Sequence, residues 1–184
     1  MYSVELKVGE KNLRLESGRV ARQSAGEVLV SYGDTVVLVC VNYNPEINQT
    51  VDFLPLTVEY RELSIAAGKI PGGFIKREMR PSDNEILSSR LIDRPLRPLF
   101  PADFRNEVQI IAYLLSSDVE HDADILGITG AATALLLSEI PFTIPVAGIR
   151  VGLLDGKYII NPTLAQQENC QVNLVIAGTR DAVV

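Results

Sequence analysis

The sequence predicts an α+β fold in which β-rich sheet layers pack on helices. Three observations lead to this class. The first fifty residues alternate apolar and polar side chains as strands do, the second half mixes helical and strand-like segments, and no linker divides the chain. A chain of 184 residues is long enough to sustain one core, so residues 1–184 are expected to form a single domain.

The strands of the first half are expected to pair as hairpins. They are predicted within residues 4–8, 12–16, 28–42 (two runs) and 51–61. Gly33 and Asp34 interrupt the third region and suit a tight turn. The run Thr35–Val41 is apolar on both faces, which predicts a central strand covered on both sides. A loop is expected at residues 67–73, which contain three glycines and a proline.

A capping box marks the start of the first helix. Ser82 can accept a hydrogen bond from the backbone N–H of Glu85, whose carboxylate can reach back to Ser82. The helix is expected to run through Ile92 and to end near Asp93, because Pro95 disfavours helical geometry at the residue before it.

The second half is expected to contain one more helix and four more strands. Strands are predicted at residues 107–117, 146–154, 158–161 and 172–177. Asp122 or Asp124 can cap a helix that extends to Leu136. This helix is rich in Ala and Gly and apolar nearly all round, so it should be buried between layers. Asp155-Gly156 predicts a turn, and residues 178–184 are expected to begin a further helix.

Charge is distributed unevenly along the chain. The formal net charge is −6, which alone argues against a nucleic-acid partner. Residues 61–105, however, hold nine Lys/Arg and six Asp/Glu, a local balance of +3, whereas the remainder holds eight and seventeen. Because phosphate contacts are local, the cationic segment predicts a localised anion-binding site.

Two glycines precede an aromatic and basic group within this segment. Phe74, Ile75, Lys76 and Arg77 follow Gly72-Gly73. An exposed aromatic ring beside cations can stack on an unpaired base while the cations hold phosphate. The alternative is that Phe74 and Ile75 fold under the loop as an anchor and the charges are simply solvated.

Arginines continue the basic character into and beyond the first helix. Arg80 precedes the capping box and therefore lies near a helix N-terminus. Arg90, Arg94 and Arg97 are spaced i, i+4 and i+7. Arginine at each position favours bidentate recognition of phosphate or carboxylate. An intersubunit set of salt bridges with Asp93 and neighbouring acids is the equally open alternative.

These motifs together resemble the polynucleotide phosphorylase family. The resemblance is carried by a glycine-flanked aromatic and basic loop, then RPS, then SRLIDRPLRPLFP. The matching segments are Ala67–Pro101, Gly18–Val41, Ile128–Ala131 and Ile149–Gly152, so the similarity covers essentially the whole chain. Ile75 and Lys76 depart from the pattern, because the family usually has a second aromatic and a second arginine there.

The resemblance implies an RNase PH-like fold (ribosomal protein S5 domain 2-like) and phosphate-dependent 3′-to-5′ degradation of RNA to nucleoside diphosphates. It also implies a homotrimeric ring with a central RNA channel. The implied RNA-binding residues at the channel mouth are Phe74, Ile75, Lys76, Arg77 and Arg80. The implied residues for phosphate or ring contacts are Arg90, Arg94 and Arg97.

The catalytic parts that the family requires are missing from the expected places. Catalytic members bind phosphate at the start of the helix after the long strand, where this chain has Glu120-His121-Asp122-Ala123-Asp124. Carboxylates at that position cap a helix well but repel a phosphate dianion. The family's two metal-holding aspartates correspond to Ala165 and Gln171, with Glu168 off register, and neither residue offers Mg²⁺ a carboxylate.

The chain is therefore expected to be the first, non-catalytic RNase PH-like domain and a fragment of a longer multidomain polypeptide. Mg²⁺ would be bound by a second RNase PH-like domain outside residues 1–184, and inorganic phosphate would be the co-substrate. No metal site is expected in residues 1–184. The expected partners are single-stranded RNA, that second domain, two further copies in a homotrimer, and RNA degradosome proteins.

A cytoplasmic location without membrane contact is expected, because no signal peptide and no apolar run of membrane-spanning length is visible. Two other functions remain open. The chain could be a non-catalytic structural member of an exosome-like ring without an RNA role. It could also be a metal hydrolase that uses Glu120, His121, Asp122 and Asp124, although helix capping explains these acids better.

Overall fold

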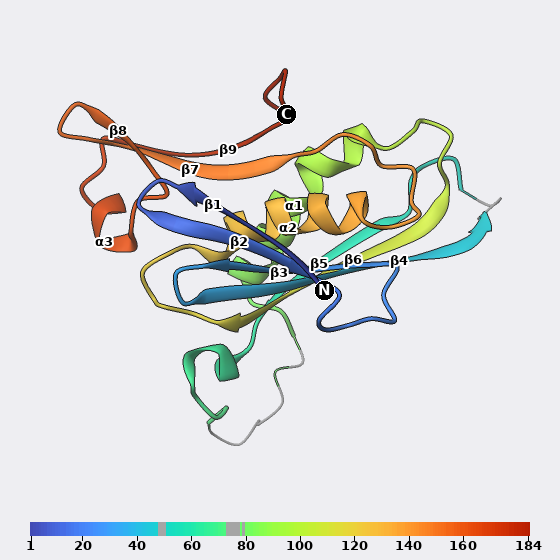
Figure 1. The fold of residues 1–184 in the computed structure, drawn as a ribbon, viewed down its shortest axis with the longest axis horizontal. Coiled ribbons are helices and arrows are strands. Elements are labelled where there is room, and N and C mark those ends of the chain that lie inside the picture. Colours follow the sequence, from blue (N-terminus) through green and yellow to red (C-terminus); the bar gives the residue numbers. More distant parts are fainter. Residues whose placement is uncertain (48–50, 73–77, 79) are drawn as a thin grey trace.

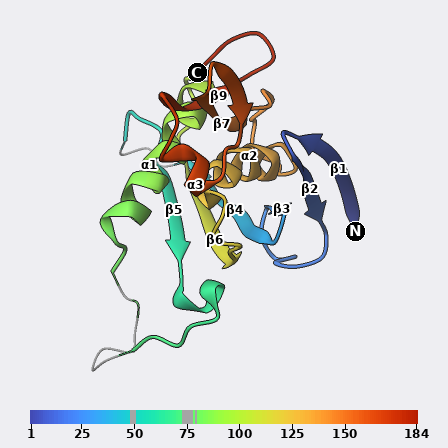
Figure 2. The same ribbon diagram turned by 90° about the vertical axis from the view of Figure 1, so that its left-hand side faces the viewer.

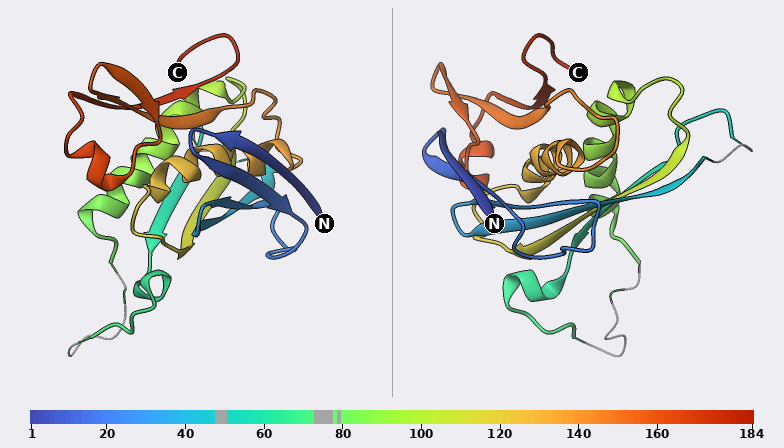
Figure 3. Two further views of the ribbon diagram at one scale, coloured as in Figure 1. Left: turned by 60° about the vertical axis from the view of Figure 1, so that its left-hand side comes forward. Right: turned by 45° about the vertical axis from the view of Figure 1, so that its right-hand side comes forward.

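The computed structural model describes residues 1–47, 51–72, 78 and 80–184, and contains two sheets with helices between them (Figure 1, Figure 3). The larger sheet has the strand order β1 (Tyr2–Val8), β2 (Lys11–Ser17), β3 (Gly26–Tyr32), β4 (Thr35–Ile47), β6 (Asn106–Ser116), β5 (Leu56–Glu62). Its strands pair antiparallel except for β5 and β6, which are parallel. The smaller, antiparallel sheet has the order β8 (Lys157–Ile160), β7 (Ala147–Leu154), β9 (Val172–Gly178).

Two long helices form the middle layer. The helices are α1 (Asp83–Leu96), α2 (Ala123–Leu136) and the short α3 (Leu164–Gln167), with 3₁₀ turns η1 (Ser64–Ala67) and η2 (Arg97–Leu99). α2 packs on β3 and β4 on one side and on β7 on the other, and α1 packs on β5. This arrangement confirms the α+β class. Among the described residues no helix is both long and apolar enough to span a membrane.

The core lies between the larger sheet and α2. Val37, Val39 and Val41 on the helix-facing side of β4 are 0% exposed, whereas the alternating residues Val36 and Leu38 are only half-buried. β4 is central, as predicted, but the expectation that both of its faces are covered is wrong. In this largely antiparallel sheet the helices cover one face only.

α2 is buried between the layers, as its composition predicted. Gly130 allows its close approach to the sheet. A Cβ at this position would lie 2.7 Å from Val39 Cγ2 and 2.9 Å from Val30 Cγ2. A larger residue would therefore push the helix away from two fully buried valines.

Both predicted hairpin turns are confirmed. Tyr32 pairs with Thr35 across the turn at Gly33, which has a φ of 60°. Leu154 pairs with Lys157 across Asp155 and Gly156, whose φ values are 49° and 73°. Positive φ at both central residues of the second turn matches the twist of a two-residue hairpin.

The capping box of α1 is confirmed, but the predicted end of the helix is wrong. Ser82 Oγ accepts from the Glu85 N–H at 3.3 Å, and the Ser82 N–H donates to Glu85 Oε2 at 2.6 Å. The helix continues through Pro95 to Leu96. Pro95 and Leu96 are buried, and this tertiary packing outweighs the local preference against helix before proline.

The helix expected at residues 178–184 is also wrong. Thr179 Oγ1 accepts from the N–H groups of Asp181 and Ala182, at 3.3 and 3.1 Å. The chain then turns back, Val183 bridges to Gly178, and the Val184 N–H donates to the Ala177 carbonyl at 2.9 Å. Threonine side chains that bond nearby backbone amides compete with helix in this way.

Candidate nucleic-acid interface

The arginines of α1 and η2 have different environments. Arg90 and Arg94 are exposed on the helix surface. Arg97 instead donates to the carbonyls of Leu54 and Leu56, at 3.1 and 3.0 Å, and pairs with Asp93 at 2.9 Å. Arg97 therefore ties the end of α1 to the start of β5, while Arg90 and Arg94 present their guanidinium groups outward.

Arg90 and Arg94 line a cleft of about 660 Å³ between α1 and the start of α2. Its other lining residues are Glu62, Asn84, Leu87, Ser88, Leu91, Leu114, Ser117, Val119, His121, Asp122, Ala123, Asp124 and Leu164. One wall thus carries two arginines and the opposite wall carries carboxylates. The sequence indicated each group separately but not that they face the same cleft.

Arg150 of the chain itself partly offsets the negative charge of the carboxylate wall. Arg150 Nε of β7 lies 2.8 Å from Asp122 Oδ2, and Arg150 Nη2 lies 3.9 Å from Asp124 Oδ2. Gln167 also donates to Asp122 Oδ2 at 2.6 Å. Asp122 holds the N-cap position of α2, but its side chain caps no backbone N–H. The predicted capping role is therefore wrong for this carboxylate, because the pairing with Arg150 and Gln167 takes its place.

The ionised form of Asp124 is destabilised despite this pairing. Burial, followed by the charge of Asp122, raises the pKa of Asp124 above its ordinary value, and Arg150 offsets only part of this effect. A phosphate dianion at the start of α2 would add a third negative group to this environment. Electrostatic repulsion from these carboxylates would disfavour phosphate at this position.

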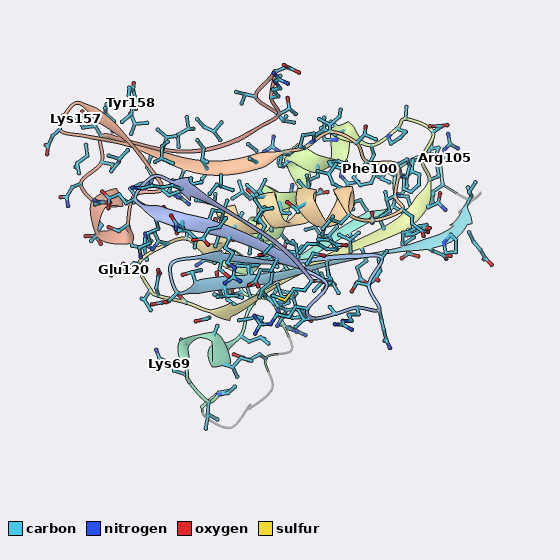
Figure 4. All side chains as sticks on the ribbon, viewed as in Figure 1. Lys69, Phe100, Arg105, Glu120, Lys157 and Tyr158 are labelled. Atoms are coloured by element: carbon cyan, nitrogen blue, oxygen red, sulfur yellow. The ribbon has the colours of Figure 1, made fainter. Side chains whose placement is uncertain are left out.

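The acidic cluster proposed from sequence divides into two groups. Asp122 and Asp124 pair with Arg150, whereas Glu120 and His121 gather with Asp118, which sequence reasoning missed. Glu120 is labelled in Figure 4. No local signal distinguished Asp118, since its importance comes from contacts with a distant residue.

That distant residue is Lys11 of β2. Its Nζ lies 3.3 Å from Asp118 Oδ2, 3.2 Å from Glu120 Oε2 and 3.4 Å from His121 Nδ1. The ammonium group thus stands at the position that a metal ion would need among these three ligands. A cluster that already holds a cation of its own is a poor metal site.

Asp118 is the centre of this network. Burial alone would raise its pKa, but hydrogen bonds from the Glu120 N–H, His121 and Thr35 outweigh burial and lower the pKa well below the ordinary range. His121 Nδ1 lies 2.9 Å from Asp118 Oδ2, and the Tyr32 ring packs edge-on against the His121 ring. These contacts join the β3–β4 hairpin, which contains Tyr32 and Thr35, to the loop before α2.

The remaining predicted site residues belong to two parts of the chain, one between β5 and α1 and the other from α3 to the start of β9. Phe74, Ile75, Lys76 and Arg77 lie outside the described residues. Arg80 is described and exposed. Figure 2 shows α1 beside β5. Ala165 lies in α3 and Gln171 immediately precedes β9.

The fold, with helices between a six-stranded and a three-stranded sheet, is that of an RNase PH-like domain. The model of the 3′ exoribonuclease family, domain 1, matches residues 9–141, and the model of domain 2 of the same family matches residues 145–184. The chain therefore belongs to the 3′ exoribonuclease family.

Curated relatives show which kind of protein in this family the chain resembles. The chain is 50% identical over 183 residues to a polyribonucleotide nucleotidyltransferase of Desulfatibacillum aliphaticivorans, covering 99% of this chain and 26% of the relative. It is 54% identical over 180 residues to one of Pelotomaculum thermopropionicum, covering 98% and 24%. The resemblance to polynucleotide phosphorylases is thus confirmed. The chain spans about a quarter of the length of these relatives.

Solved structures show the same fold at low identity. An Archaeoglobus fulgidus exosome with RNA bound to the active site matches with a TM-score of 0.68 and 18% identity, covering 90% of this chain and 72% of that chain. Rice Rrp46 matches with a TM-score of 0.71 and 14% identity, covering 95% and 76%. At these identities the likeness establishes the fold alone.

Proposed function

We propose that this chain is the RNA-binding, ring-forming first RNase PH-like domain of a longer polynucleotide phosphorylase, and that it contains no catalytic centre. The observation that carries this proposal is the start of α2. Where a phosphate pocket is expected, Asp122 and Asp124 face the cleft and hold Arg150 in an internal ion pair. Arg150 is therefore engaged by the chain's own acids at the start of α2.

The metal requirement of the reaction also supports a catalytic centre in a second domain. Phosphorolysis joins inorganic phosphate to the terminal nucleotide and releases a nucleoside diphosphate, and a divalent ion helps to neutralise the developing charge. Ala165 has no ligand atom in its side chain and Gln171 offers only a neutral amide. These residues do not fit Mg²⁺, which prefers carboxylates. The ion and the reacting phosphate would belong to a second RNase PH-like domain.

RNA contact is assigned to residues 74–80, which are called the basic segment, and to α1. Phe74, Ile75, Lys76, Arg77 and Arg80 would guide single-stranded RNA at the mouth of a channel in a trimeric ring. Arg90 and Arg94, which line the cleft, would contact phosphate groups or a neighbouring ring subunit, together with Arg97. The assembled enzyme would act in the cytoplasm, with RNA degradosome proteins as further partners.

The direct experiment is a phosphorolysis assay on the purified 184-residue chain. With oligo(A), excess phosphate and Mg²⁺, we expect no release of nucleoside diphosphate and no polymerisation in the reverse direction. Oligo(A) binding, measured by fluorescence anisotropy in the same buffer, should remain detectable. Release of ADP above a protein-free blank would overturn the assignment of a non-catalytic domain.

Simple measurements distinguish two other functions from the one proposed. A purely structural ring member would give no RNA crosslink in the segment between β5 and α1. A metal hydrolase would retain a stoichiometric ion at the Asp118, Glu120 and His121 cluster after purification. The position of Lys11 among these three residues argues against the hydrolase.

A further inference from the structure

The two edges of the larger sheet are protected differently. At the β5 edge, side chains of α1 and η2 bond the backbone groups that point away from the sheet. The Tyr60 N–H donates to Ser89 Oγ at 2.9 Å. The Glu62 N–H donates to Glu85 Oε1 at 2.8 Å, and Arg97 donates to the first carbonyl of the strand at 3.0 Å. Because these groups already have partners, a further strand has little to bond at this edge.

The β1 edge is open. β1 pairs with β2 on one side and ends the sheet on the other, as Figure 2 shows. Its side chains are exposed up to Lys7, and Tyr2, Val4 and Leu6 are 83, 62 and 45% exposed. No residue in the described part of the chain bonds the backbone of β1 on its outer side. An exposed edge strand with apolar side chains is a template for pairing with another strand.

The β1–β2 hairpin determines which backbone groups of β1 are free. Val8 and Lys11 flank its two-residue turn, and in such a turn the carbonyl of the first residue accepts from the N–H of the fourth. Hydrogen-bonded and non-hydrogen-bonded pairs alternate along an antiparallel ladder. Ser3, Glu5 and Lys7 therefore direct both their N–H and their C=O groups away from β2. These three residues can bond an additional strand.

Charge selects one register for the pairing of β1 with a second copy of itself. In an antiparallel pair with two-fold symmetry, the outward residues of one copy must face those of the other. Pairs centred on Glu5 or on Lys7 place like charges directly opposite each other, which is unfavourable. A pair centred on Val4 sets Glu5 opposite Ser3. A pair centred on Leu6 sets Glu5 of each copy opposite Lys7 of the other, and this opposite-charge contact occurs twice across the axis.

The same register also matches the apolar side chains. Leu6 lies opposite Leu6 of the second copy, and Val4 lies opposite Val8. In the single chain Val4 and Leu6 are exposed, so burying them against each other is favourable. Glu5 can keep the hydrogen bond of 2.6 Å that it accepts from Asn12 Nδ2, because a carboxylate accepts several hydrogen bonds.

We infer that β1 is a docking edge for a second copy of this chain, which pairs antiparallel with Leu6 opposite Leu6 and continues the larger sheet across a two-fold axis. The inference goes beyond the proposed function and does not rest on it, because β1 lies outside the residues assigned to RNA. A two-fold contact is compatible with a three-fold ring, since the two symmetries combine in a closed D3 assembly. A pair of seven-residue strands is a small interface, so the dimer should be weak.

Reversing the two charges one at a time tests the register. Glu5→Lys alone would set two lysines opposite each other, and Lys7→Glu alone would set two glutamates opposite each other. We expect either variant to dimerise roughly tenfold more weakly than the wild-type chain in sedimentation velocity experiments. An equal mixture of the two variants should recover the association, because each contact between them then joins opposite charges.

Glu59→Lys is the matched control. Glu59 lies on β5, is exposed, and its side chain makes no hydrogen bond or ion pair with the part of the chain that the structure describes. The control changes net charge by the same amount as Glu5→Lys and should leave dimerisation unchanged. An equally weak dimer in the control would assign the effect to net charge and overturn the inference. A mixture that associates no better than either variant alone, or a wild-type chain that stays monomeric up to about 1 mM, would also overturn it.

Disulfide formation gives a second test, which does not need the charge variants to fold. Leu6→Cys places two thiols on the axis, where the Cα atoms of a non-hydrogen-bonded pair lie about 4.5 Å apart, within the range of a disulfide. In Val4→Cys the two thiols would lie four residues apart along the strands, about 13–14 Å. Oxidation with diamide should therefore crosslink Leu6→Cys much faster than Val4→Cys, above the background that Cys40 and Cys170 give in the wild-type chain. Equal crosslinking rates in the two variants would overturn the inference.

Discussion

Replacing Arg150 with methionine tests whether an internal ion pair occupies the place of a phosphate pocket. Methionine keeps most of the length of the side chain but removes its charge. The substitution leaves Asp122 and Asp124 without the cation that lies 2.8 and 3.9 Å from their carboxylates. It also removes the hydrogen bond from Arg150 Nη1 to Asn173, which measures 2.8 Å.

The expected loss of stability follows from the burial of the three side chains. Exposed ion pairs contribute about 0–1 kcal/mol, and removal of one partner of a fully buried pair costs about 3–5 kcal/mol. The side chains of Arg150, Asp122 and Asp124 are 16, 22 and 19% exposed. They are therefore closer to the buried limit, and we expect the free energy of unfolding at pH 7 to fall by about 2–3 kcal/mol.

The loss should depend on pH. The folded-state pKa of Asp124 is raised, so its ionised form weakens the folded state once the pH exceeds the ordinary aspartate value. This penalty disappears below that value, where the carboxyl is protonated in both states. Removing Arg150 raises the pKa of Asp124 further. The difference between variant and wild type should thus shrink when urea unfolding is measured at pH 4 rather than at pH 7.

A second set of variants checks the physical reason. Adding Asp122→Asn and Asp124→Asn to Arg150→Met should restore much of the lost stability, because no uncompensated charge remains. A loss below about 0.5 kcal/mol, or a loss of equal size at both pH values, would refute the argument. In either case the ion pair would not be what stabilises the start of α2.

Three further predictions concern RNA contact and packing. Replacing Lys76 and Arg77 together with Ala should weaken binding of all RNA sequences about equally and reduce the slope of log affinity against log salt by roughly one to two. An unchanged slope would mean that both side chains are only solvated. Phe74→Ala should cost about 1–3 kcal/mol of single-stranded RNA affinity, and Ile75→Phe should increase affinity by restoring a second stacking surface. A large fall in the Tm of Phe74→Ala with unaltered RNA affinity would instead make Phe74 a core anchor. Gly130→Ala should lower the free energy of unfolding by about 1 kcal/mol in urea titrations, because overpacking costs about 2 kcal/mol and the gain in helix propensity offsets about 1 kcal/mol. Equal stability would show that α2 can shift freely.

Features that depend on neighbours in sequence were predictable. The turns at Gly33 and at Asp155-Gly156, the capping box at Ser82, and the burial of α2 each follow from a few adjacent residues, and the structure confirms them. The acidic start of α2 was equally visible. These features are local because backbone conformation and helix faces are set within one or two turns.

Features that depend on distant contacts were not predictable. Nothing near Arg150 indicates that it pairs with Asp122, and nothing near Lys11 indicates that it enters the cluster around Asp118. The continuation of α1 through Pro95 has the same origin, since burial of that turn in the core decides against the local preference. Pairings between remote segments leave no periodic signal in a single sequence.

The same contacts explain how a chain of net charge −6 could offer a surface to RNA. Many of its acids near the cleft and the basic segment are engaged inside the chain: Asp118 and Glu120 with Lys11, Asp122 and Asp124 with Arg150, Glu85 with Arg61, and Asp93 with Arg97. Arg80, Arg90 and Arg94 are exposed and form no ion pair with any described residue. Net charge counts all of these groups alike, whereas a phosphate group responds to those within a Debye length of about 8–10 Å. Among the described residues of α1 and of the stretch before it, the unpaired arginines Arg80, Arg90 and Arg94 outnumber the unpaired acids Glu78 and Asp83, and this local excess of positive charge supports the proposed contact with RNA.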